Sequence, residues 1–168
     1  MLKTKIESIL FVSDTPVTKE KLTELLTPAT QDEIVTALNE MKMKYLDPKY
    51  SFSLECVADG YQLRTKSDYK NLIVKYLEEK PEKLSSQSMD TLAIVAYKQP
   101  ITKADIEEIR GVESYFLLKT LIEKRLIRIV GKKEVLGKPL LYGTTDYFLE
   151  LVGLTSINEL PELGASCD

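Results

Sequence analysis

The chain has 168 residues, of which 43% are hydrophobic and 29% charged, so its composition is typical of a soluble globular protein with one ordinary domain or two small ones. Its net charge of −3 gives no overall attraction to nucleic acid or to anionic membranes, and no run of about 18 apolar residues could cross a bilayer. It contains no histidine, which excludes catalytic triads and metal motifs that depend on this residue.

The amino-terminal stretch and the cysteines indicate a cytoplasmic protein. The first residues, MLKTKIESILFVSD, place a charge inside the apolar stretch and offer no small-residue cleavage site, so a signal peptide is not expected. Cys56 and Cys167 are too few and too far apart to form a disulfide framework. The sequence therefore predicts a reduced, cytosolic protein.

The first half of the chain has the pattern of three helices followed by a β-hairpin. Thr18 is predicted to cap the second helix, whose inner face would carry Leu22, Leu25 and Leu26. The third helix would bury Ile34, Leu38 and Met41. The predicted segments are helices over 2–12, 18–26 and 31–45, strands over 51–57 and 61–65, and a closing helix over 68–77.

The second half repeats this plan. When residue n is set against residue n + 84, Pro16 pairs with Pro100, Val17 with Ile101 and Thr18 with Thr102. A third helix is predicted over 114–124, a hairpin within 126–145 and a closing helix over 146–152. The predicted division is a first domain over 1–78, a linker over 79–87, a second domain over 88–154 and a carboxy-terminal tail over 155–168.

Residues 96–112, AYKQPITKADIEEIRGV, form the clearest local motif. Pro100 ends one helix, and Thr102 is predicted to cap the next, with Asp105 favoured near its positive end. Ile106 and Ile109 would face inward. Gly111 can supply the left-handed residue that ends the helix. The segment therefore predicts a helix-turn-helix corner.

Three helices followed by a hairpin are typical of the winged-helix arrangement. The predicted fold class is therefore α+β, mainly α, with two tandem winged-helix domains. Each domain of about 75 residues is near the lower limit for a self-sufficient core, so docking or dimerisation would stabilise it.

The second hairpin is basic, which makes DNA binding the alternative function. Over residues 124–138, six Lys and Arg against one Glu give a local charge of 6 − 1 = +5. The candidate DNA contacts are Arg128, Lys132, Lys133 and Lys138. The third helix of each half lacks the Arg, Asn and Gln cluster that addresses base edges, and Tyr115 and Phe116 cannot both point inward if Leu118, Leu121 and Ile122 form the core stripe. An outward aromatic there favours a protein contact.

Catalytic motifs are not supported. Residues 131–139 have five residues between the two glycines and a proline where a phosphate-binding loop needs Ser or Thr. Ser67 and Lys70 have the spacing of a serine-lysine pair, but the companion motifs are missing. We therefore expect no enzyme activity, catalytic residue, cofactor or metal.

The stretches SMDTLAIVAYKQPITKADIEEIRGV and LIRIVGKKEVLGKPLLYGTTDYFLELVGL resemble the segregation and condensation protein B (ScpB) family. The resemblance covers about residues 85–163, and the first half fits by architecture alone. Lys138 stands where the family more often has Arg, which keeps the charge.

The resemblance implies a non-catalytic, homodimeric partner of the bacterial SMC–kleisin complex. Such a protein would bind the kleisin subunit, segregation and condensation protein A, and through it the SMC ATPase, in support of chromosome condensation and partition. It would be cytoplasmic and associated with the nucleoid, with only indirect or weak DNA association. The residues expected to bind protein are Tyr97, Lys98, Gln99, Arg110, Tyr115 and Tyr142.

Overall fold

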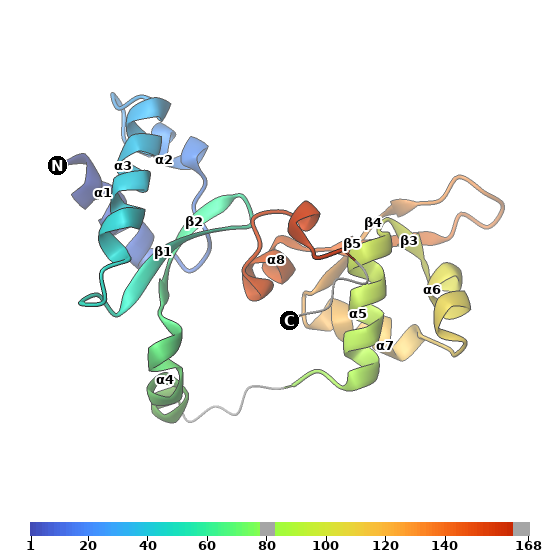
Figure 1. The fold of residues 1–168 in the computed structure, drawn as a ribbon. Coiled ribbons are helices and arrows are strands. Elements are labelled where there is room, and N and C mark those ends of the chain that lie inside the picture. The colour runs from blue at the N-terminus through green and yellow to red at the C-terminus, as the bar shows by residue number, and fades with distance from the viewer. Residues whose placement is uncertain (78–82, 163–168) are drawn as a thin grey trace. The chain divides into compact units, whose positions relative to one another are not determined.

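The computed structural model describes residues 1–77 and 83–162, and the chain divides into two compact units. Unit 1 is Met1–Pro81 and unit 2 is Glu82–Asp168. Helices predominate and the strands form two small sheets (Figure 1), which confirms a mainly helical α+β chain.

Unit 1 consists of three helices, a hairpin and a closing helix, in the predicted order. A short 3-10 turn, η1, leads into the closing helix. The elements are α1 (Leu2–Val12), α2 (Lys19–Leu25), α3 (Gln31–Tyr45), β1 (Phe52–Val57), β2 (Gly60–Thr65), η1 (Ser67–Tyr69) and α4 (Lys70–Leu77).

Unit 2 follows the same order, with one extra short strand. Helix α5 begins at Ser86, inside the segment predicted as linker, of which residues 79–82 lie outside the described part of the chain. The elements are α5 (Ser86–Lys98), β3 (Ile101–Thr102), α6 (Lys103–Arg110), α7 (Tyr115–Glu123), β4 (Ile127–Lys132), β5 (Leu140–Thr144), α8 (Asp146–Val152) and η2 (Ile157–Glu159).

Side-chain caps mark where several of the helices begin, among them α2 and α3. Thr18 accepts a hydrogen bond from the backbone N–H of Lys21, as predicted. Thr30 and Glu33 form a reciprocal capping box at the start of α3. A cap of this kind contributes about 0.5–2 kcal/mol because it satisfies backbone N–H groups that have no partner within the helix.

The core of unit 1 lies between α1, α3 and the hairpin. Ile34, Leu38 and Met41 are buried, as their spacing predicts. The Tyr45 ring is 0% exposed and lies 4.9 Å from the Phe52 ring, so it joins the end of α3 to β1. Burial, helped by a hydrogen bond with Glu7, raises the pKa of the Tyr45 hydroxyl well above its usual range and keeps it neutral.

The core of unit 2 contains Val95, Ile106, Leu121 and Ile127, each at most 1% exposed. The segment after α8 contributes to it, since Ile157 and Leu160 pack against this core. Residues 155–162, predicted as part of a tail, thus include side chains that help to cover the second core.

Two predicted core positions are wrong. Leu25 is 53% exposed and Ile109 is 54% exposed, although both continue the apolar spacing of their helices. Each lies in the last turn of a short helix, where the neighbouring helices no longer cover it. Helical spacing gives the direction of a side chain but not the extent of its cover.

The two hairpins confirm the repeated plan. In unit 1, Ala58 and Asp59 have φ values of 47° and 56°, as a two-residue type I′ turn requires, and an isolated antiparallel bridge joins Val17 to Tyr61. In unit 2 the corresponding pairing is longer and forms the short strand β3, in which Ile101 pairs with Tyr142. The resulting sheet has the order β3-β5-β4.

Candidate functional site

The corner between α5 and α6 has the predicted geometry. Gln99 has an extended backbone, with φ −58° and ψ 145°, and α5 ends before Pro100. Thr102 accepts a hydrogen bond from the Asp105 N–H, and the Asp105 carboxylate accepts one from the Thr102 N–H. Gly111 ends α6 in the left-handed region at φ 71°. The corner is thus fixed by its own residues.

Asp105 also links the corner to the basic hairpin. Its carboxylate accepts a 2.6 Å hydrogen bond from the Thr102 hydroxyl and lies 3.6 Å from the ammonium of Lys133. The hydrogen bonds from Thr102, and to a smaller degree the charge of Lys133, lower the pKa of the Asp105 carboxyl below its usual range. Asp105 therefore stays charged at neutral pH. Its negative charge interacts favourably with the positive end of the α6 dipole.

The side chain of Gln99 is held by hydrogen bonds within unit 2 and acts as a structural latch. Its side-chain carbonyl accepts a 2.7 Å bond from the Thr144 N–H, and its amide donates to the Thr144 hydroxyl and to the Ala96 carbonyl. These bonds connect the end of α5 to β5. A Cβ at Gly143 would lie 2.9 Å from the side-chain carbonyl oxygen of Gln99. The absence of a side chain at this position therefore allows Gln99 to approach β5.

We expect Gln99→Ala to lower the free energy of unfolding by about 1–3 kcal/mol, because the four hydrogen bonds of the Gln99 side chain are lost and the groups that faced the amide lose their partner. Urea denaturation followed by circular dichroism measures this change. Lys98→Ala is the matched control, since Lys98 is exposed and its side chain forms no hydrogen bond or ion pair with another described residue. An equal loss in both variants would contradict the latch.

Arg110 and Glu107 organise the turn between α6 and α7 through Ser114. The Arg110 guanidinium donates a 2.8 Å hydrogen bond to the hydroxyl of buried Ser114. The Ser114 N–H donates at 2.7 Å to the Glu107 carboxylate, which lies 3.4 Å from the Lys103 ammonium. Arg110 is therefore committed at least partly to the fold.

An exposed apolar patch lies around this turn, and we call it the corner patch: Ile109, Val112, Tyr115 and Phe116. These side chains are 53–75% exposed, with Phe116 the highest. The Tyr115 and Phe116 rings meet edge to face with centroids 5.4 Å apart, and the Lys103 ammonium lies 5.7 Å from the Tyr115 centroid. Four large apolar groups in water on one turn are typical of an interaction surface.

Phe116 is the residue that the site prediction missed. The prediction recognised that Tyr115 and Phe116 cannot both face inward and chose Tyr115 for the outer face; in the structure both are outward. The sequence does indicate that Phe116 faces outward. The residues that share its face of the helix, three, four and seven positions later, are Lys119, Thr120 and Glu123, and all three are polar.

The other predicted protein-binding residues are more dispersed. The Tyr97 hydroxyl donates a 2.8 Å hydrogen bond to the Pro161 carbonyl, which ties the segment after α8 to α5. Tyr142 is half-buried in the central strand β5 and packs against the core. Of the six predicted residues, Lys98 and Tyr115 are exposed, and Tyr115 is the one that belongs to the corner patch.

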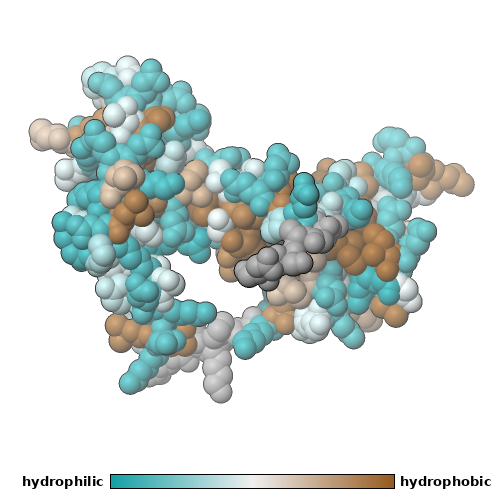
Figure 2. All heavy atoms as spheres, in the orientation of Figure 1, coloured by the Kyte–Doolittle hydropathy of each residue, from teal (hydrophilic) through white to brown (hydrophobic). Residues whose placement is uncertain are grey.

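Two of the four candidate DNA contacts in the basic hairpin are engaged in ion pairs. Lys133 is paired with Asp105, and the Lys138 ammonium lies 3.9 Å from the Glu134 carboxylate. Arg128 and Lys132 are exposed and have no ion pair within the described part of the chain. The hairpin tip is apolar (Figure 2), with Leu136 fully exposed, a feature that the charge count concealed.

Residues 1–77 and 83–162 contain no cluster of three or more His, Cys, Asp or Glu side chains that could hold a metal ion. Over the same ranges no helix combines the length and apolar character needed to span a bilayer.

Comparison with known proteins gives consistent matches. The family model described as segregation and condensation complex subunit ScpB matches residues 4–163. The segregation and condensation protein B of Syntrophotalea carbinolica is 44% identical over 162 residues, which cover 96% of this chain and 82% of the relative.

Two solved structures are also similar. The crystal structure of ScpB from Mycobacterium tuberculosis is 30% identical, with a TM-score of 0.43, over 92% of this chain and 96% of that one. A crystal structure of a dimer of a ScpB N-terminal domain complexed with a ScpA peptide is 17% identical, with a TM-score of 0.42, over 44% of this chain and 91% of that one.

Proposed function

Because the chain belongs to the segregation and condensation complex subunit ScpB family, we propose that it is a non-catalytic subunit of the bacterial SMC–kleisin complex. In this role it forms a homodimer and binds the kleisin subunit, segregation and condensation protein A, and through it the SMC ATPase. It would act in the cytoplasm at the nucleoid, in support of chromosome condensation and partition.

We also propose that each unit is a winged-helix domain, with domains over 1–78 and 88–154 joined by a linker. The order of three helices and an antiparallel hairpin in both units supports this assignment, and so does the bridge between Val17 and Tyr61, which corresponds to the pairing of Ile101 with Tyr142. A mainly structural role for the corner explains why its polar side chains are bonded within the unit.

The corner patch is the observation that carries kleisin binding. Tyr and Arg are enriched among residues that dominate binding energy, and Tyr115 and Arg110 lie at the same turn. The fold does not use the exposed rings of Tyr115 and Phe116, since both rings lie outside the buried core of unit 2. We propose that an apolar segment of the kleisin covers these rings.

The test is co-purification of this chain with its kleisin partner at micromolar concentration. Phe116→Ser and Tyr115→Ser should each weaken binding by about thirtyfold, or about 2 kcal/mol, as expected for an aromatic anchor. Their unfolding midpoints should stay near that of the wild type because both side chains are exposed. Leu136→Ser is the control, since this leucine is fully exposed on the hairpin tip. Undiminished binding by both aromatic variants would contradict the assignment.

Weak DNA association is the second candidate, supported by Arg128 and Lys132, which are exposed and form no ion pair among residues 1–77 and 83–162. Two phosphate contacts give only a shallow dependence on salt, whereas a regulator that relied on the whole hairpin would lose affinity steeply. Retention of the chain on duplex DNA at increasing salt, run beside the kleisin assay, distinguishes the two functions.

A further inference from the structure

The hairpin of unit 2 ends in an apolar tip that the fold does not cover. Residues 128–138 are all exposed, and the hairpin projects beyond the helices of its unit (Figure 1). At its end Leu136 is fully exposed and Val135 is 49% exposed. Neither side chain belongs to the hydrophobic core of unit 2. Leu136 therefore contributes nothing to the packing of its own unit.

Hydrogen bonds hold this tip in one defined turn. The Lys138 N–H donates a 2.9 Å hydrogen bond to the Val135 carbonyl, and Gly137 has φ 85°, as the third residue of a type II turn requires. Below the turn, the Lys133 N–H donates at 2.9 Å to the Pro139 carbonyl. The leucine at the apex is thus held in place before it meets a partner, which lowers the ordering cost of binding.

Cations lie on both sides of the apolar tip. Residues 128–138 contain one acid, Glu134, and four cations, which gives a local charge of 4 − 1 = +3 in a chain of net charge −3. Lys132 forms no ion pair with another described residue. Lys138 lies 3.9 Å from Glu134, but their side chains are 68% and 84% exposed, and exposed pairs of this kind contribute little. A phosphate can therefore replace Glu134 beside Lys138.

We propose that this tip binds duplex DNA from the minor groove, with Leu136 inserted between two base pairs and Lys132 and Lys138 on the flanking phosphates. The proposal rests on the DNA association given above as the second candidate function, and it names the site and the mode of binding. Proteins that kink DNA from the minor groove insert apolar wedges, leucine among them, between base steps. The side chains of residues 135–137 have no polar group that could read base edges. Binding should therefore follow the deformability of the duplex.

The size of the tip favours DNA over other partners. The leucine and valine side chains together carry about half the carbons of a myristoyl chain, which alone holds a protein at a membrane only marginally. A stable protein interface buries about 1,200–2,000 Å², far more than two side chains offer. One inserted apolar side chain, in contrast, is enough to unstack a base step.

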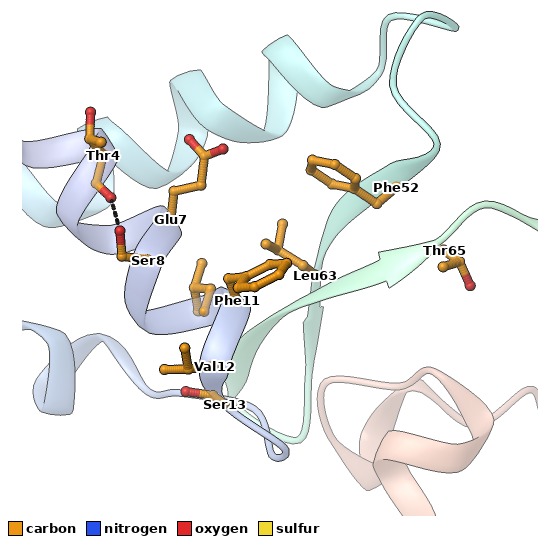
Figure 3. A pocket seen from close by; sticks show the side chains of 10 residues that line it. Thr4, Glu7, Ser8, Phe11, Val12, Ser13, Phe52, Leu63 and Thr65 are labelled. Carbon is orange, nitrogen blue, oxygen red and sulfur yellow. Dashed lines mark hydrogen bonds between the residues drawn. The ribbon is translucent and has the colours of Figure 1, made fainter.

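The first hairpin does not have such a tip. Its turn consists of Ala58 and Asp59, so an acid stands at its end. The apolar side chains exposed beside that hairpin, Phe11 among them, line a groove of about 630 Å³ between α1 and the strands (Figure 3). A groove cannot enter a base step, so the wedge is assigned to the second hairpin.

The test measures the affinity of the full chain for a duplex of roughly 20 base pairs, about two helical turns, by fluorescence anisotropy. Leu136→Ser should weaken binding about tenfold, because the leucine loses its burial, and should leave the salt dependence of the affinity unchanged. Lys132→Ala should instead reduce the salt slope by about one. Leu136→Phe should retain binding, since phenylalanine also serves as a wedge. Leu151→Ser is the matched control: it makes the same change at a leucine that is 56% exposed in α8, and its affinity should equal that of the wild type.

A fluorescent adenine analogue, aminopurine, detects the insertion itself because its emission rises when it unstacks. Placed at a TA step, which unstacks easily, it should brighten with the wild type and not with Leu136→Ser. Undiminished affinity in Leu136→Ser, or binding without brightening, would overturn the wedge and leave weak DNA association standing. No binding of the wild-type chain to the duplex would overturn both, and so would Leu136-dependent binding to phosphatidylserine vesicles in its place. Kleisin co-purification of Leu136→Ser is read separately and should be unchanged.

Discussion

Tyr45→Ala is expected to destabilise unit 1 by about 3–5 kcal/mol, the range for removing a large buried aromatic side chain. The Tyr45 ring is 0% exposed at the end of α3. It meets the Tyr50 ring edge to face at 5.2 Å and the Phe52 ring at 4.9 Å. Its removal opens a cavity where α3, the following turn and β1 come together, and a small domain has little stability to spare.

Hydrogen exchange detected by mass spectrometry measures this effect because it resolves peptides from the two units. Peptides from α1, α3 and the first hairpin should lose protection in Tyr45→Ala, and peptides from α5 and α7 should not. Tyr69→Ala is the control, since Tyr69 is 36% exposed in the same unit. Equal protection in the wild type and in Tyr45→Ala would show that the ring does not stabilise unit 1.

Gly60→Ala is expected to cost unit 1 about 1–3 kcal/mol through overpacking. A Cβ at position 60 would lie 2.8 Å from the Pro16 Cβ and 2.9 Å from the Pro16 carbonyl carbon. Much of the obstacle is backbone, which cannot rotate away as a flexible side chain can. The displaced segment carries the bridge between Val17 and Tyr61, whose two backbone hydrogen bonds are 2.9 and 2.8 Å long.

Gly131→Ala is the matched control for Gly60→Ala. A Cβ at Gly131 would meet nothing within 4 Å, and neither glycine has a positive φ. The two variants therefore differ in the room available for the added methyl group. The midpoint of urea denaturation should fall for Gly60→Ala and stay near that of the wild type for Gly131→Ala. A midpoint unchanged in Gly60→Ala would contradict the close approach of residues 16 and 60.

The sequence alone determined the features that depend on neighbouring residues. Thr18 and Thr102 cap helices because a hydroxyl can reach the backbone N–H three residues on, wherever the rest of the chain lies. Gly111 ends α6 because only a residue without a Cβ adopts a positive φ without strain. The resemblance carried by residues 85–163 is confirmed by a family match that extends over residues 4–163.

Only the tertiary structure decided which side chains remain exposed to water and which form hydrogen bonds to distant parts of the chain. Ile109 follows the apolar spacing of α6 but is exposed, because no neighbouring element covers the end of that helix. The sequence did not predict that the Gln99 side chain is hydrogen-bonded to Thr144, 45 residues away. Tyr97 likewise bonds Pro161 across 64 residues. Periodicity and capping act over a few residues, whereas cover and long-range bonding depend on segments that only folding brings together.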